Sequence, residues 1–147
     1  MDRFKNFTVL INNISRNIKR IKSEEMKDFD LKTPHVSCIY YLYIENNLTA
    51  KELTDICDED KAQISRSIDY LENNGYIICE STAKKRYRSN LYLTEKGKEV
   101  GKIICEKIDR ILYEASVGLS EENRKIMYES LALINSNLAN IIYKKGE

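Results

Sequence analysis

Apolar residues return every third or fourth position along the first part of the chain. The stripe consists of Phe4, Phe7, Ile11, Ile14, Ile18 and Ile21, and its spacings alternate between three and four residues. This alternation is a heptad seam, which places the side chains on one narrow line of a helix. We therefore predict a first helix from about residue 3 to residue 27, with a seam that requires a helical partner.

Residues that start helices predict two further helices in the next part of the chain. Thr33 is expected to cap a helix in which Pro34 takes the first helical position, and the residues that follow are apolar on most sides, as in a buried helix. Thr49 and Glu52 have the spacing of a capping box, in which a hydroxyl and a carboxylate each accept a backbone hydrogen bond. This box opens a short helix that is expected to reach about Cys57.

A fourth helix and a β-hairpin are expected next. Asp60 is a suitable N-cap for a helix over residues 61–74, and Gly75 follows as a normal helix end. Residues 76–80 and 91–94 are rich in β-prone side chains and enclose a polar, basic loop. A helix-turn-helix followed by such a hairpin is the winged-helix arrangement.

Two amphipathic helices complete the predicted order. Thr94 is the expected N-cap of the first, Gly118 is expected to end it, and Ser120 is the expected N-cap of the second. Apolar residues recur at helical spacing in both, namely Val100, Ile104, Ile108, Ile111 and Ala115, then Ile126, Leu131, Ile134, Leu138, Ile141 and Ile142. The predicted fold class is mainly α, a winged helix-turn-helix with the element order α-α-α-α-β-β-α-α.

The charges place a basic region in the middle of the chain. The 147 residues carry a net charge of only +1, yet residues 61–98 hold eight basic and four acidic residues. A local basic patch on a near-neutral protein is what a polyanion-binding face requires. The apolar runs are too short to span a membrane and the N-terminus lacks a secretory signal, so we expect a cytoplasmic protein without a membrane partner.

The four cysteines, Cys38, Cys57, Cys79 and Cys105, lack the paired spacing of a zinc site, and His35 is the only histidine. Each cysteine lies in or beside an apolar stretch, so buried and unreactive thiols are expected. The sequence has no phosphate-binding loop, no carboxylate pair suited to a cleft and no nucleophile–histidine pair. We therefore expect no metal, no cofactor and no enzymatic activity.

The fourth helix presents a polar face that suits DNA. Its inward face is predicted to consist of Ile64, Ile68 and Leu71. The outward surface of its first half offers side chains that hydrogen-bond bases or phosphates, and these are the candidate DNA-binding residues Lys61, Gln63, Ser65 and Arg66. One alternative is that Gln63 completes a capping arrangement with Asp60. Another is that Arg66 pairs with Asp69 or Tyr70 on a solvated surface.

The loop of the predicted hairpin is a second candidate for DNA contact. It carries four basic residues and no acidic residue, and its candidates are Lys84, Lys85, Arg86 and Arg88. Long basic side chains on a loop suit phosphates, because neutralising the phosphates releases counterions. The alternative is a solvated charge run without a ligand.

The stretch from Leu48 to Gly97 resembles the multiple-antibiotic-resistance regulator (MarR) family. The similar segments read LTAKELTDICDEDKAQISRSIDYLENNGYII and KKRYRSNLYLTEKG. The first contains what looks like that family's recognition helix, and LTEKG looks like its junction between wing and helix. The flanking helices also match the family in order and length. The resemblance implies double-stranded DNA as the partner and a homodimer built by the first and the last two helices.

The same resemblance implies a division of the chain and a site for an effector. It describes one MarR-like domain over residues 1–147, with a DNA-binding lobe over 33–97 and dimerisation helices over 1–28 and 98–145. Family members often bind a small aromatic effector between these parts. The candidate ligand-binding residues here are His35, Tyr40, Tyr41 and Tyr43. The alternative is that these four are core or interface residues. Many members carry an Asp–Arg pair in the wing, where this chain has Lys85 and Tyr87.

The function predicted from these features is sequence-specific DNA binding by a transcriptional regulator. We expect a ligand-responsive repressor that acts as a homodimer on a pseudo-palindromic operator, with half-sites roughly one helical turn apart. Two alternatives remain. One is a metal- or redox-responsive winged-helix regulator that uses Cys57, and the other is a winged-helix protein–protein adaptor, which needs no basic wing.

Overall fold

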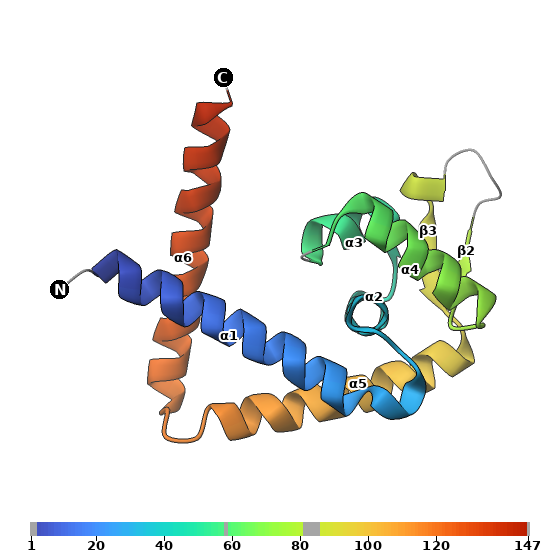
Figure 1. The fold of residues 1–147 in the computed structure, drawn as a ribbon, viewed down its shortest axis with the longest axis horizontal. Helices are drawn as coiled ribbons and strands as arrows, with labels where there is room; N and C mark the ends of the chain where they lie inside the picture. Colours follow the sequence, from blue (N-terminus) through green and yellow to red (C-terminus); the bar gives the residue numbers. More distant parts are fainter. Residues whose placement is uncertain (1–2, 58, 81–85, 147) are drawn as a thin grey trace. The chain divides into compact units, whose positions relative to one another are not determined.

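The computed structural model of the chain describes residues 3–57, 59–80 and 86–146, and it leaves out the side chains of residues 3, 4 and 86. It confirms the mainly helical order, with a hairpin between the fourth and fifth α-helices (Figure 1). The elements are α1 (Arg3–Glu25), η1 (Lys27–Phe29), α2 (Thr33–Glu45), β1 (Leu48–Thr49), α3 (Ala50–Ile56), α4 (Lys61–Asn73), β2 (Ile77–Cys79), η2 (Arg86–Arg88), β3 (Asn90–Leu93), α5 (Glu95–Ala115) and α6 (Glu121–Lys145).

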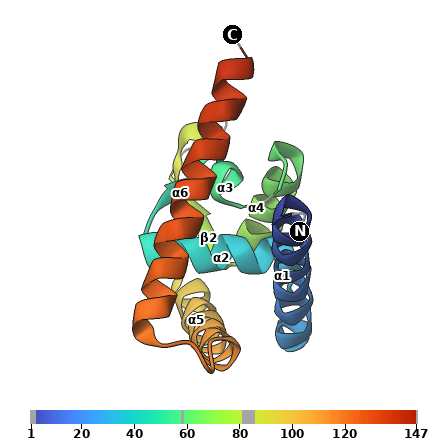
Figure 2. The same cartoon turned by 90° about the vertical axis from the view of Figure 1, so that its left-hand side faces the viewer.

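The chain forms two compact units, residues 1–107 and residues 108–147, and the first of them contains all of the sheet and most of the helices. The first unit is built around α2, with α3 and α4 on one side of it and α5 on the other (Figures 1 and 2). Its core side chains come from each of these helices and from the strands, and the fully buried ones include Val36, Cys38, Ile39, Leu42, Leu53, Ile64, Leu71, Leu91 and Ile104. The prediction of a central, buried helix after Pro34 is thus confirmed.

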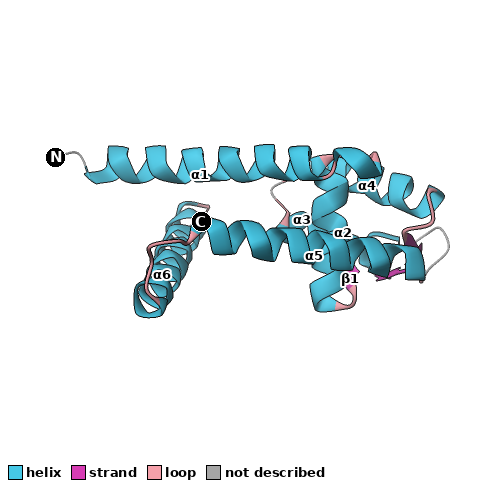
Figure 3. Ribbon diagram, turned by 90° about the horizontal axis from the view of Figure 1, so that it is seen from below, coloured by secondary structure: helices cyan, strands magenta, loops and turns pink. Residues whose placement is uncertain are grey.

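The sheet has three short antiparallel strands in the order β1-β3-β2. Figure 3 draws the strands in magenta. The predicted hairpin is confirmed, with Ile77 opposite Leu93 and Cys79 opposite Leu91. Leu91 also pairs with Leu48 of β1, a strand that the sequence did not predict. A strand of two residues has no repeat of apolar and polar positions, so no pattern could announce it.

Helix ends follow the predicted caps with one exception. The hydroxyl oxygen of Thr94 accepts a hydrogen bond from the Gly97 N–H (3.1 Å) at the start of α5, and Ser120 caps α6 in the same way through Asn123 N–H (3.1 Å). The prediction that Thr33 caps α2 is wrong, since Thr33 is already helical and Lys32 is the capping residue. The ring of His35 stabilises this helix start, because its Nδ1 accepts a hydrogen bond from the Lys32 N–H at 3.1 Å.

The helices α1 and α6 both carry apolar stripes that the described chain leaves exposed. In α1, Ile14 is 52% exposed and Ile21 is 38% exposed. In α6, described by itself, no residue is buried, and Ile142 is 73% exposed. The C-terminal end of α1 is held in the first unit by Lys107, whose ammonium contacts the Glu25 backbone oxygen (2.9 Å) and carboxylate (3.2 Å).

None of the helices in the described part of the chain is long and apolar enough to cross a membrane.

Candidate nucleic-acid interface

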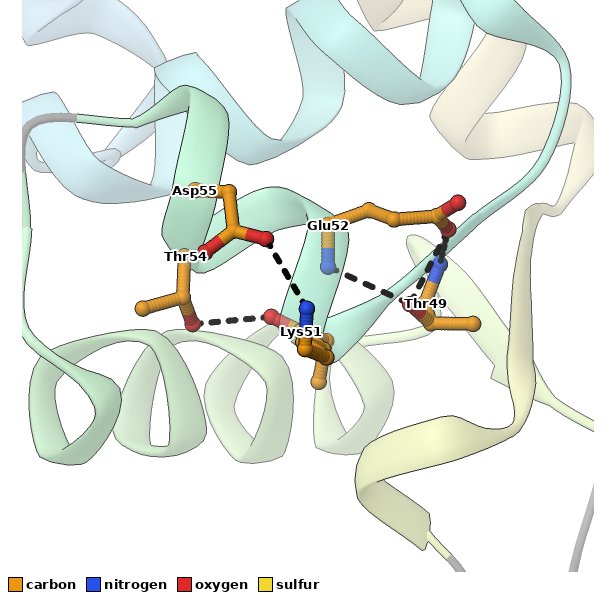
Figure 4. A network of polar contacts seen from close by, with 6 residues as sticks. Thr49, Lys51, Glu52, Thr54 and Asp55 are labelled. Atoms are coloured by element: carbon orange, nitrogen blue, oxygen red, sulfur yellow. Dashed lines mark hydrogen bonds and ion pairs between the residues drawn. The ribbon is translucent and has the colours of Figure 1, made fainter. Parts of the chain in front are cut away.

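The first helix of the helix-turn-helix begins in a complete capping box (Figure 4). The hydroxyl oxygen of Thr49 accepts the Glu52 N–H at 3.2 Å, and the Glu52 carboxylate accepts the Thr49 N–H at 2.7 Å and its hydroxyl at 2.9 Å. The hydrogen bond from the Thr49 N–H, followed by that from its hydroxyl, lowers the pKa of Glu52. The prediction from the sequence is confirmed, and the box fixes where the chain turns from β1 into α3.

The second helix, α4, is anchored by its predicted cap and its predicted inner face. The Asp60 carboxylate accepts the Gln63 N–H at 2.7 Å. The predicted inward residues Ile64, Ile68 and Leu71 are all buried. Ser67 is buried with them, and its hydroxyl donates to the Gln63 carbonyl oxygen at 2.9 Å. With its inner face fixed in this way, α4 presents one defined surface to solvent.

Three of the four candidate residues on α4 share that solvent-facing surface. Lys61, Ser65 and Arg66 are exposed, whereas Gln63 is half-buried on the flank. The side-chain oxygen of Gln63 accepts from the Arg66 guanidinium at 2.9 Å, and its amide donates to the Ser67 hydroxyl at 3.4 Å. Gln63 therefore orients Arg66, and its link to the Asp60 cap runs through its backbone N–H.

The wing is described only in part. Lys84 and Lys85 lie outside the described residues, as does the side chain of Arg86, and Arg88 is exposed at the end of η2. Tyr87, to which the sequence assigned no role, lies against α4, with the Lys61 ammonium nitrogen 4.3 Å from the centre of its ring. The sequence marks Tyr87 only as a departure from the family's Asp–Arg pair, and its contact with α4 becomes visible only in the structure.

In the described part of the chain the four candidate ligand-binding residues make different contacts. His35 stacks on Tyr70 of α4, with ring centres 4.2 Å apart, and burial lowers the pKa of His35. Tyr40 and Tyr41 meet edge to face at 5.1 Å. Tyr43 lines an open groove beside α5, on a different part of the first unit from Tyr41. Ligand binding by these residues stays a prediction.

Tyr41 lines a separate cavity of about 300 Å³ between α1, α2 and the end of α3. The apolar part of its wall comes from the exposed stripe of α1 (Ile11, Ile14 and Ile18) and from Ile56 at the end of α3. The polar part includes Lys22, whose ammonium lies 3.5 Å from the Ser37 hydroxyl. Burial lowers the pKa of Lys22, so its charged form is incompletely solvated. Sequence reasoning missed Lys22, although it directly follows the last residue of the seam.

The cysteines are arranged differently from the expectation that all four are buried. Cys38 and Cys57 are buried, but Cys79 and Cys105 are half-buried. The thiol of Cys38 forms a hydrogen bond with Cys57, which lies beside the recognition helix. This hydrogen bond lowers the pKa of Cys57 and raises the pKa of Cys38. Within residues 3–57, 59–80 and 86–146, no group of three or more His, Cys, Asp or Glu residues is arranged to hold a metal ion.

Known proteins resemble this chain in sequence and in fold. The family described as the winged helix DNA-binding domain matches residues 35–112. YybA of Bacillus subtilis, an uncharacterised HTH-type transcriptional regulator, is 23% identical over 125 residues, which cover 85% of this chain and 83% of that protein.

Solved structures show the same likeness. A MarR family regulator from Neisseria meningitidis has a TM-score of 0.81 at 18% identity, with 99% of both chains covered. MepR from S. aureus, solved as a complex with DNA, has a TM-score of 0.75 at 22% identity, with 90% of this chain and 97% of that chain covered. The predicted winged-helix fold and the predicted likeness to the MarR family are both confirmed.

Proposed function

We propose that the chain, which belongs to the family of winged-helix DNA-binding domains, is a transcriptional regulator of the MarR type and acts as a homodimeric repressor of a pseudo-palindromic operator. The observation that carries this proposal is the solvent-facing side of α4. Lys61, Ser65 and Arg66 are exposed there on a helix whose opposite face is locked into the core. A rigid helix with polar side chains near its N-terminus is suited to the major groove.

The roles of these side chains follow from their chemistry. Arg66 is the candidate for reading a guanine, since a guanidinium can donate to two acceptors of one base edge. Gln63 supports this role by holding the guanidinium at 2.9 Å before DNA arrives. Lys61 and Ser65 lie one turn apart and are suited to the phosphates beside that base. The basic wing, Lys84, Lys85, Arg86 and Arg88, would contact the neighbouring backbone or minor groove.

A homodimer is supported by the two exposed apolar stripes. The seam of α1 and the stripe of α6 each leave isoleucines in solvent, and apolar patches of this kind on a single chain usually mark an interface. Two copies related by a two-fold axis would present two identical recognition helices, which suits two half-sites of inverted sequence about 34 Å apart, one helical turn of DNA. This geometry is why we propose a pseudo-palindromic operator.

A small aromatic effector is supported by the cavity that Lys22 and Tyr41 line. The cavity of about 300 Å³ combines apolar walls with the partly desolvated ammonium group of Lys22, and Lys19 and Glu59 also line it. An aromatic acid would fill the apolar part and restore a counter-charge to Lys22. Because α1 also carries the proposed dimer seam, a ligand here would alter the spacing of the two recognition helices and release the operator.

The test is selection of duplexes from a random pool at moderate salt, followed by affinity measurements on the recovered sequence. We expect a palindrome, and we expect Arg66→Ala to weaken binding about tenfold or more, the usual cost of losing a bidentate base contact. Lys32→Ala is the control, since Lys32 is an exposed basic residue before α2, outside the candidate DNA contacts and outside the proposed dimerisation helices. Equal losses in both variants would contradict the assignment.

Failure of the wild-type protein to bind any duplex at low salt would overturn the proposal. It would favour the protein–protein adaptor, whose binding needs no basic surface and depends little on salt.

The redox-responsive alternative gains one observation from the structure. Cys57 ends α3 immediately before the turn into α4, and Cys38 lies within hydrogen-bonding reach of it. Oxidation of this pair by a peroxide would change the support of the recognition helix. If peroxide abolishes operator binding in the wild-type protein but not in Cys57→Ser, this alternative replaces the ligand-responsive mechanism.

A further inference from the structure

We propose that Tyr87 is a positioning residue that clamps Lys61 and thereby joins the wing to the recognition helix, so that both engage DNA as one unit. The proposal rests on the DNA-binding function proposed above. It concerns a residue on the wing that faces the protein, in addition to the basic residues that face the DNA.

The first observation is the contact itself. The Lys61 ammonium nitrogen lies 4.3 Å from the centre of the Tyr87 ring, well within the range in which a cation is attracted to an aromatic face. Lys61 is the first residue of α4 and Tyr87 is the middle residue of η2, so one side-chain pair connects the two DNA-facing elements. η2 also packs against α3, which places the base of the wing on the helix-turn-helix.

The second observation is the shape of the surface around the ring. Tyr87 borders a cavity of about 170 Å³ whose other walls come from Ala50 and from α4. The α4 wall consists of Lys61, Ser65 and Asp69, which lie at successive turns of the helix, and of Ile68 beside them. Tyr87 is half-buried there, whereas the next residue, Arg88, is exposed. In a 3₁₀ turn neighbouring residues point about 120° apart, so a ring fixed on α4 leaves Arg88 directed elsewhere.

The third observation is the unusual position of a lysine at the start of a helix. The N-terminus of α4 carries partial positive charge from its free N–H groups, so a cation there is unfavourable for the helix alone. No acidic residue lies in the first turn of α4, although the Asp60 cap precedes it. The electron-rich face of Tyr87 offsets part of this repulsion, and an incoming phosphate would offset the rest. Tyr87 thus holds Lys61 ready for an anion at the helix end.

The clamp is tested first in the free protein, where DNA plays no part. The Tyr87 ring should shift the NMR signals of the Lys61 ε-methylene protons upfield. We expect this shift in the wild-type protein and in Tyr87→Phe, which keeps the aromatic face, and its loss in Tyr87→Leu, which is of similar size without one. Unshifted Lys61 signals in the wild-type protein would overturn the proposal.

The consequence for DNA is tested by a double-mutant cycle on the selected operator. Tyr87→Leu should weaken binding about two- to fivefold, the range of an exposed cation–aromatic contact, and Tyr87→Phe should bind like the wild type. Lys61→Met should reduce the magnitude of the negative slope of log K against log salt by about one, and Tyr87→Leu should also reduce this magnitude. In the Lys61→Met background, Tyr87→Leu should have no further effect.

Two outcomes would overturn the role in DNA binding. Additive losses in the cycle would mean that Tyr87 acts without Lys61, and a loss in Tyr87→Phe would mean that its hydroxyl contacts the DNA. A wild-type protein that shows the upfield shift but binds no duplex would retain the clamp as a contact. In that case it is the proposed DNA-binding function that fails, and the positioning role fails with it.

Discussion

Gly97, the third residue of α5, lies where that helix meets the end of the recognition helix. A Cβ atom added there would lie 2.1 Å from the carbonyl oxygen of Tyr76 and 3.1 Å from a methyl group of Leu93. The Tyr76 oxygen cannot easily withdraw, because it belongs to the backbone and already accepts the Thr94 N–H at 3.0 Å. Gly97→Ala must therefore move α5 by about 1 Å relative to β2, against packed side chains on both sides.

The expected cost follows from two opposing effects. Overpacking against rigid atoms costs about 1–3 kcal/mol, and the upper part of that range applies because a backbone atom is hit. Alanine recovers up to about 1 kcal/mol through its higher helix propensity, and less near a helix start. We expect Gly97→Ala to lower the free energy of unfolding by about 2 kcal/mol, measured by urea denaturation at matched protein concentration.

Gly101→Ala is the matched control on the same helix. A Cβ atom at Gly101 would lie 2.7 Å from the Tyr43 ring and 3.0 Å from the Tyr43 Cβ, so the ring can turn toward an open groove but the Cβ can give only slightly. We expect Gly101→Ala to cost about 1 kcal/mol, less than Gly97→Ala, because no backbone atom is hit. Equal destabilisation by the two variants, or a fully stable Gly97→Ala, would refute the argument that the Tyr76 carbonyl sets the approach of α5.

Three further predictions concern the first unit. Burial lowers the pKa of His35, so its contribution to the free energy of unfolding is fully present above the unfolded pKa near 6.5 and is lost as the pH falls toward the lower pKa of the folded state. Urea denaturation between pH 7.5 and 5 should show this decrease, and an equal decrease in His35→Asn would contradict it. Thr49→Ala should cost about 1 kcal/mol in urea denaturation, because the N-cap hydroxyl is lost, whereas Thr49→Ser should cost little. Cys57, whose pKa the Cys38 hydrogen bond lowers, should react with iodoacetamide before Cys38 in the native protein, as followed by mass spectrometry; the reverse order would exclude it as the more reactive thiol.

The sequence predicted those features whose causes are local. Thr49 and Asp60 begin helices because each hydroxyl or carboxylate reaches an N–H three residues on, and both caps form. Ile64, Ile68 and Leu71 are buried because a helix repeats about every 3.6 residues. The same periodicity placed Lys61 and Arg66 on the exposed face without any knowledge of tertiary structure. Even the misplaced start of α2 differs from the structure by a single residue.

Contacts between distant residues could not be predicted in this way. Periodicity identifies the face of α4 that meets solvent, but nothing in the sequence states that Tyr87 of the wing returns to Lys61. The stacking of His35 on Tyr70 has the same origin, since it depends on how closely α2 approaches α4. The sequence groups the His35 ring with the tyrosines of α2 as a candidate ligand contact, which stays a prediction. The structure adds that the ring caps one helix and packs on another.

For the apolar stripe of α1, the sequence predicts the helix, which has a local cause, but not the surface that covers the stripe. Its heptad spacing predicted a helix with a partner, and the helix forms, yet Ile14 remains 52% exposed in the described chain. A helix of 23 residues that buries so little gains little from packing, and intrinsic propensity alone holds such helices only marginally in water. The contact of Lys107 with Glu25 secures only its last turn. Farther toward the N-terminus, Lys22 contacts Ser37 of α2, but the isoleucines of the stripe stay exposed. We therefore propose that the apolar surface of a second copy covers this stripe, so that the stability of α1 depends on protein concentration.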